Sequence, residues 1–207
     1  MKIFKIHLKN FRNHKIISYV DYFPEENFGQ CHCYSYPYTM KNYDNITNHF
    51  PGGLFKCVTR ISLFDERPFQ HEFFLKISQS FPLLEGLTIQ NFQSQNKKSD
   101  DDNNEHLPII KYSHLTKLYL INVHDDYIEQ FLFHSKSVLT NYISLSVQHD
   151  ALQRATNHFT REQTRINSAK ISHFFLPGRH DLSKDFRQYF PSLQSYCFSL
   201  VTYNKNN

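Results

Sequence analysis

A histidine directly precedes an acidic side chain at four places in this sequence, and such pairs could bind a metal ion or serve as acid and base. They are His71-Glu72, His124-Asp125-Asp126, His149-Asp150 and His180-Asp181. The last three precede segments with helical periodicity, where an acid can cap the positive end of a helix. The first lacks the second histidine of the H-E-x-x-H zinc motif, because Leu75 occupies that position. We therefore expect these pairs to be structural and predict no metal site.

Other catalytic patterns are missing from the sequence. It contains no P-loop and no G-x-S-x-G motif, and no cysteine has a nearby base at a known catalytic spacing. Four cysteines in 207 residues are too few for a disulfide scaffold, and C-x-C at Cys31 is the wrong spacing for a common zinc knuckle. We expect all four cysteines to be reduced packing residues in the core. The sequence predicts neither an enzyme nor a cofactor site.

Charge and composition narrow the possible partners. The 23 Lys and Arg exceed the 19 Asp and Glu by only four and are spread along the chain, unlike the basic stripe that binds phosphate backbones. No apolar run reaches the roughly 18 to 20 residues of a membrane helix, and the first ten residues lack a signal-peptide core. We expect an intracellular protein, cytoplasmic or nuclear, that binds neither nucleic acid nor membranes.

An apolar pattern repeats along the chain and predicts the strands that position the polar residues between them. The segments Leu84 to Asn91 and Leu115 to Asn122 both match L-x-x-L-x-[LI]-x-N. The third apolar position recurs at residues 8, 33, 63, 89, 120, 147, 173 and 198, with the poorest matches near 33 and 173. The mean step of about 27 residues lies within the range of leucine-rich repeats. The period predicts an α/β leucine-rich-repeat solenoid, with a curved parallel sheet on the concave face and helices on the convex face.

The predicted array spans residues 1–207 as a single domain of about seven or eight repeats, with a polar loop at residues 93–106. Its parallel strands are expected at residues 6–8, 31–33, 61–63, 87–89, 118–120, 145–147, 171–173 and 196–198. Acidic N-caps are expected before the helices, at Asp65, Asp125 or Asp126, Asp150 and Asp181. We expect the polar residues at positions 10, 35, 65, 91 and 122 to bond the backbone of the turns.

Residues 62–74, 81–89 and 124–132 resemble the leucine-rich-repeat regions of F-box-like proteins, from families expanded in some invertebrate lineages. The resemblance covers most of the array and is most specific between Tyr34 and Phe159. It implies the substrate-recognition part of a cullin-type ubiquitin ligase receptor, whose F-box docks an adaptor while the repeats hold the substrate.

An F-box starts with Leu-Pro-x-Glu, and the nearest segment here, Phe23-Pro24-Glu25-Glu26, lies inside a repeat interval. We expect a C-terminal fragment or isoform that reaches the cullin adaptor only through an F-box not present here. The alternative is a stand-alone scaffold solenoid for protein interactions with no ubiquitin link.

Strand alternation predicts the binding surface, because residues beside the third apolar position point away from the buried layer. We predict that a protein substrate contacts His7, His32, Tyr34, Phe64, Gln90, Tyr119, Gln148 and Phe174. The aromatic residues are the strongest candidates, since such rings are enriched at interface hot spots. For each of them, packing on a neighbouring strand is the alternative.

Overall fold

The computed structural model describes residues 7–11, 14–96, 107–178, 180 and 182–199. A seven-stranded parallel sheet runs through most of this length, in the order β12-β11-β10-β8-β6-β5-β4. Its strands are β4 (Asn42–Ile46), β5 (Arg60–Phe64), β6 (Gly86–Asn91), β8 (Lys117–Val123), β10 (Ile143–Ser146), β11 (Ile171–Pro177) and β12 (Ser195–Ser199). The strands expected from residue 61 onward are therefore confirmed, whereas β4 was not predicted.

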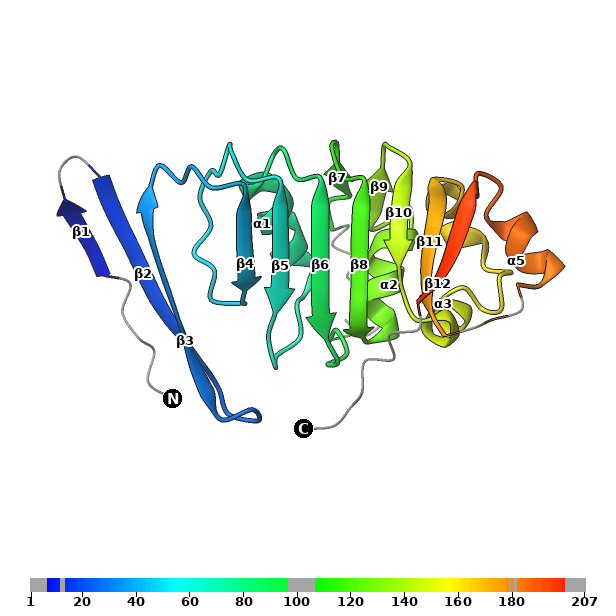
Figure 1. Cartoon of the computed structure of the whole chain (residues 1–207), viewed down its shortest axis with the longest axis horizontal. Helices are drawn as coiled ribbons and strands as arrows, with labels where there is room; N and C mark the ends of the chain where they lie inside the picture. The colour runs from blue at the N-terminus through cyan, green and yellow to red at the C-terminus, as the bar shows by residue number, and fades with distance from the viewer. Residues whose placement is uncertain (1–6, 12–13, 97–106, 179, 181, 200–207) are drawn as a thin grey trace.

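Helices cover one face of this sheet. They are α1 (His71–Ser80), α2 (Asp125–Leu132), α3 (His149–Ala155), α4 (Arg165–Ser168) and α5 (Lys184–Tyr189), with a 3-10 turn, η1, at Glu162–Thr164. A small parallel pair, β7 (Ile110–Tyr112) and β9 (Ser137–Leu139), lies in the same layer. In Figure 1, α1 and α2 lie behind the strands, so the face of the sheet toward the viewer carries no helix.

The core lies between the sheet and the helices. Leu63, Ile89 and Leu120 are register partners on β5, β6 and β8, and all three are buried. Phe74 of α1 and Phe131 of α2 are buried against each other in an edge contact, with ring centroids 5.6 Å apart. Alternating apolar strand residues and aromatic helix residues thus supply one continuous core, as the 20 phenylalanines suggest.

The N-terminal segment departs from the predicted array. Residues 7–11 and 14–36 form an antiparallel sheet of β1 (His7–Phe11), β2 (His14–Phe23) and β3 (Phe28–Tyr36). The expected parallel strands at 6–8 and 31–33 are therefore wrong, and residue 6 lies outside the described part. Parallel strands need a crossover of a dozen or more residues, whereas a short turn at Asn27, with a positive φ of 50°, joins β2 to β3.

Polar contacts fasten this antiparallel sheet to the edge of the parallel one. The Asp21 carboxylate on β2 is only 2% exposed; it accepts a hydrogen bond from Thr47 Oγ1 at 2.7 Å and is also bonded to His49 Nδ1. The hydroxyls of Tyr19 and Tyr43 lie 3.1 Å apart. Both residues that hydrogen-bond to Asp21 follow β4, so β2 is docked beside the first strand of the large sheet.

The expected acidic N-caps are also wrong. The N-cap residues of α1, α2, α3 and α5 are Gln70, His124, Gln148 and Ser183. Asp125, Asp126 and Asp150 instead lie in the first helical turn, where a carboxylate still favours the positive end of the helix. Asp181 lies outside the described residues, as do residues 97–106 of the predicted polar loop.

The cysteines are not the core residues that their number suggested. All four are free, with Cys31, Cys33 and Cys197 exposed and Cys57 half-buried. Cys31 and Cys33 lie on β3 of the antiparallel sheet, and Cys197 lies on the edge strand β12, so none reaches the main core.

Candidate functional site

The helix-free face of the parallel sheet carries a row of side chains that crosses five strands. Register pairing places Ser62, Thr88, Tyr119, Ser146 and Phe175 side by side on β5, β6, β8, β10 and β11. The first four are half-buried, and Phe175 is 42% exposed. We name these five residues the sheet-face row. It combines small hydroxyl side chains with two aromatic rings.

Several predicted contact residues lie on or beside this row. Tyr119 belongs to it, and Gln90 follows Thr88 on the same side of β6. Gln148, just after β10, is exposed and donates from Nε2 to Asn122 Oδ1 at 3.0 Å. Phe64 lies opposite Gln90 in the register, but rings of the antiparallel sheet cover it. Its centroid is 5.1 Å from that of Phe23.

The predicted contacts from the N-terminal segment are not on this face. His32 is buried and stacks on Tyr19, with centroids 4.5 Å apart. Burial lowers the pKa of His32. Tyr34 is 8% exposed and packs on Tyr43 and Phe55 in the core. The expected outward orientation is therefore wrong for both residues, because β3 belongs to the antiparallel sheet.

His7 is likewise outside the parallel sheet. It lies on β1, opposite Ser18 of β2 in an antiparallel register. Its strand is separated from β4 by β2 and β3, so the backbone does not bring His7 into the sheet-face row.

Phe174 was assigned to the wrong face. Ile143 pairs with Ile171, but Ser144 pairs with His173, so β11 carries one extra residue at this point. A shift of one residue exchanges the two faces of a strand. Phe174 is consequently 1% exposed and in the core, and Phe175 takes the outward position.

A pocket of about 270 Å³ opens where β8, β10 and β11 end. Asn122, Gln148, His149, Asp150, Pro177 and His180 contribute to its lining. The carboxyl ends of parallel strands are the usual location of ligand sites in open α/β sheets. The pocket is adjacent to the sheet-face row, since Ser146 also lines it.

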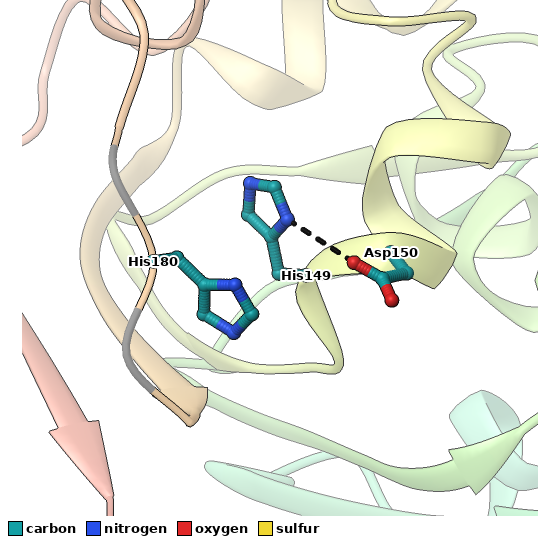
Figure 2. A group of neighbouring side chains, drawn as sticks. All are labelled: His149, Asp150 and His180. Carbon is teal, nitrogen blue, oxygen red and sulfur yellow. Dashed lines mark hydrogen bonds and ion pairs between the residues drawn. The ribbon is translucent and has the colours of Figure 1, made fainter.

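Two histidines meet in this pocket (Figure 2). The imidazoles of His149 and His180 stack with centroids 4.5 Å apart and an interplanar angle of 18°. His149 Nδ1 lies 3.5 Å from Asp150 Oδ1, and His180 Nε2 lies 2.7 Å from Pro177 O. His149 follows β10 at the start of α3 and His180 follows β11, so the pairing of these two neighbouring strands brings the histidines together.

Comparisons with known proteins do not indicate a function for this chain. No family model, no curated protein and no solved structure matches the chain. The fold defines an α/β protein with a seven-stranded parallel sheet and helices. Within the described residues, no helix has the length and apolar character needed to cross a membrane.

Proposed function

We propose that this chain is a leucine-rich-repeat solenoid that binds a protein partner through the sheet-face row. The regular register of its parallel strands supports the repeat assignment. Successive strand starts are joined by the same backbone bond: Glu85 N donates to Thr59 O at 2.8 Å, and Thr116 N donates to Glu85 O at 2.9 Å. Equivalent positions of neighbouring units are thus stacked, as a solenoid requires.

Polar side chains at the strand ends support the same assignment. Asn91 is 1% exposed; its Nδ2 donates to Arg67 O at 2.8 Å and its Oδ1 accepts from Gln93 N at 2.9 Å. Asp65 accepts from Asn48 N at 2.9 Å and from Arg67 N at 3.0 Å. Each side chain therefore links its own turn to the preceding one, which is the role expected for polar residues at these positions.

Position 122 differs from positions 65 and 91. Ile89 pairs with Leu120, whereas Asn91 pairs with Val123, so β8 has one extra residue. Asn122 adopts a positive φ of 48° there and accepts a hydrogen bond from Gln148. In place of Asn122, the Asp126 carboxylate accepts from Gln95 N at 2.8 Å and links the two successive turns.

The observation that carries the binding proposal is the sheet-face row itself. Among the described residues, no helix packs over the row, and it exposes Phe175 beside serine and threonine hydroxyls. Rigid aromatic rings bury large areas at low entropic cost, whereas hydroxyls adapt their hydrogen bonds to a partner. A protein surface matches this mixture better than a nucleic acid, which would require a concentrated positive charge.

The partner that we propose is a substrate of an F-box-type ubiquitin ligase. The support for this step is the resemblance of residues 62–74, 81–89 and 124–132. The cullin adaptor would then bind through an F-box elsewhere in the intact gene product. A scaffold protein with no ubiquitin link would use the same face, so co-purification of a cullin adaptor with the intact gene product distinguishes the two.

The experiment for the binding face replaces Tyr119 and Phe175 with alanine together. Proteins captured by the purified chain are identified by mass spectrometry, and the affinity of the main partner is then measured for both chains. If each ring is a hot spot of roughly 2 kcal/mol, one replacement weakens binding about 30-fold, and the double variant weakens it by up to about 800-fold. Ile166→Ala is the control, because Ile166 is an exposed apolar side chain that lies on α4, outside the sheet-face row. Unchanged affinity in the double variant would contradict the assignment of this face.

A further inference from the structure

We propose that His149, Asp150 and His180 bind a divalent transition-metal ion of the zinc class. Two imidazoles and one carboxylate converge here from α3 and from the segment after β11 (Figure 2). Each offers one donor atom, and the three atoms lie within 4.8 Å of one another. The two histidines come from neighbouring strand ends, so the fold rather than a local motif creates the site.

The donor set fits borderline divalent ions. Imidazole nitrogen and carboxylate oxygen bind Zn²⁺ at about 2.0 to 2.2 Å, and Co²⁺ and Ni²⁺ prefer the same ligands. Two donors of one tetrahedral zinc are then about 3.4 Å apart, so the donor atoms must approach one another by up to about 1.4 Å. Small side-chain rotations can supply this movement, because both histidines are half-buried and the Asp150 side chain is 80% exposed.

His180 is already held in a suitable tautomer. A carbonyl oxygen only accepts, so the 2.7 Å contact with Pro177 O requires the proton to be on Nε2 of His180. The lone pair of a neutral ring is then on Nδ1 and is free for a metal. Metal-binding histidines commonly donate their other ring N–H to a backbone carbonyl in this way, which fixes the ring orientation.

His149 is oriented by its neighbours as well. Its ring stacks on His180 and is also close to Phe159 and Phe186, with centroid distances of 6.0 and 6.3 Å. The rings therefore limit the rotation of His149 while its nitrogens stay at the pocket. The nearby cation, Arg154, donates to both oxygens of Asp125 at 2.7 and 2.8 Å. Among the described residues, the only ion-pair partner of Asp150 is His149.

Three protein ligands leave at least one coordination position open toward the pocket. Closed structural zinc sites have four protein ligands, so this site belongs to the open type. Gln148 and Asn122 line the same pocket and place amide groups near that open position. The site is separate from the hydrogen bonds that hold the strands together, so loss of the metal would leave the sheet intact.

The experiment titrates the full 207-residue chain, prepared without a histidine tag, with Co²⁺ and Zn²⁺. The Co²⁺ absorption spectrum reports ligand number and geometry, and calorimetry gives the stoichiometry of Zn²⁺. We expect one saturable site per chain. His180→Gln and His149→Gln should each weaken it at least ten-fold, and Asp150→Asn should weaken it too. His114→Gln is the matched control, because it removes one exposed histidine outside the pocket and should leave the affinity unchanged.

Far-UV circular dichroism shows which variants remain folded. His180 lies outside the helices and strands, so His180→Gln decides the question if His149→Gln fails to fold. Zn²⁺ should raise the melting temperature of the wild type and not that of His180→Gln. Either a wild type with no saturable site, or undiminished binding in folded His180→Gln, would overturn the proposal.

Discussion

Two buried tyrosines differ in whether their hydroxyl groups have a partner. Tyr127 of α2 is fully buried, and its hydroxyl accepts a hydrogen bond from Phe69 N at 3.1 Å. Phe69 precedes α1, so this bond connects two successive units across the core. Tyr112 of β7 is also buried, but its hydroxyl has no hydrogen-bond partner among the described residues. Replacing each with phenylalanine therefore separates the value of the bond from the cost of burying a hydroxyl.

Tyr127→Phe should lower the free energy of unfolding by about 1 to 3 kcal/mol, because it leaves the buried Phe69 N–H without an acceptor. Tyr112→Phe should leave it unchanged or raise it by up to about 1 kcal/mol, since a desolvated and unpaired hydroxyl is removed. Burial raises the pKa of the Tyr112 phenol, which agrees with its dry surroundings. The expected difference between the two variants is therefore at least about 1 kcal/mol.

Urea titrations followed by far-UV circular dichroism measure both variants against the wild type. In thermal unfolding, each kcal/mol corresponds to about 2 to 4 °C for a chain of this size. Equal losses of unfolding free energy in the two variants would refute the reasoning. They would show that the hydrogen bond between Tyr127 and Phe69 N does not stabilise the fold more than the unpaired Tyr112 hydroxyl does. Loss of stability in Tyr112→Phe alone would reverse the assignment of the two environments.

Three other predictions concern the strand register, the docking of the antiparallel sheet and alkaline pH. Phe174→Ala should lower the free energy of unfolding by about 3 to 5 kcal/mol, and Phe175→Ala should lower it by less than about 1 kcal/mol. If urea titrations gave similar losses for the two variants, they would contradict the extra residue in β11. Asp21→Ala removes a buried carboxylate with two hydrogen-bond partners and should cost about 2 to 3 kcal/mol by the same measurement, and a wild-type value would show that these bonds do not hold β2. Burial raises the pKa of Tyr19 and Tyr43, so the folded chain keeps protons that the unfolded chain releases above about pH 10. The contribution of these tyrosines to the free energy of unfolding should be fully present below that pH and fall above it by up to about 1.4 kcal/mol per pH unit for each tyrosine. Melting curves of Tyr43→Phe should show a shallower decline with pH, and a decline equal to that of the wild type would contradict the role of Tyr43.

The central strands could be predicted because their sequence repeats both its composition and its spacing. Leu87 and Ile89, like Leu118 and Leu120, combine a two-residue alternation with a fixed distance to the next unit. Helix starts were less predictable, since histidine, glutamine and serine take the N-cap positions and the acids move into the first turn. The predicted acids lie in the first turn of α2 and α3, whereas Asp65 lies six residues before the start of α1.

The outward orientation of the predicted contact residues is found only where the strand register is regular. Tyr119 keeps the expected phase because Leu118 and Leu120 on either side of it are both buried. Phe174 changes face because β11 has one extra residue, and the sequence contained a sign of this. The expected apolar position there is occupied by His173, which pairs with Ser144 and not with a core residue. A polar residue in an apolar slot of a repeat therefore indicates a bulge at that strand.

The antiparallel strands β2 and β3, which do not follow the predicted repeat, have a physical role at the end of the parallel sheet. The parallel sheet ends at β4, and the apolar side chains on this edge strand, such as Tyr43, need cover from water. Tyr34 packs on Tyr43 and Phe55, and Tyr19 bonds Tyr43, so β2 and β3 supply that cover beside β4. Phe28, Cys31 and Cys33 imitate the apolar spacing of a repeat, but a short turn, and not a helical stretch, joins β2 to β3, so these residues belong to a hairpin.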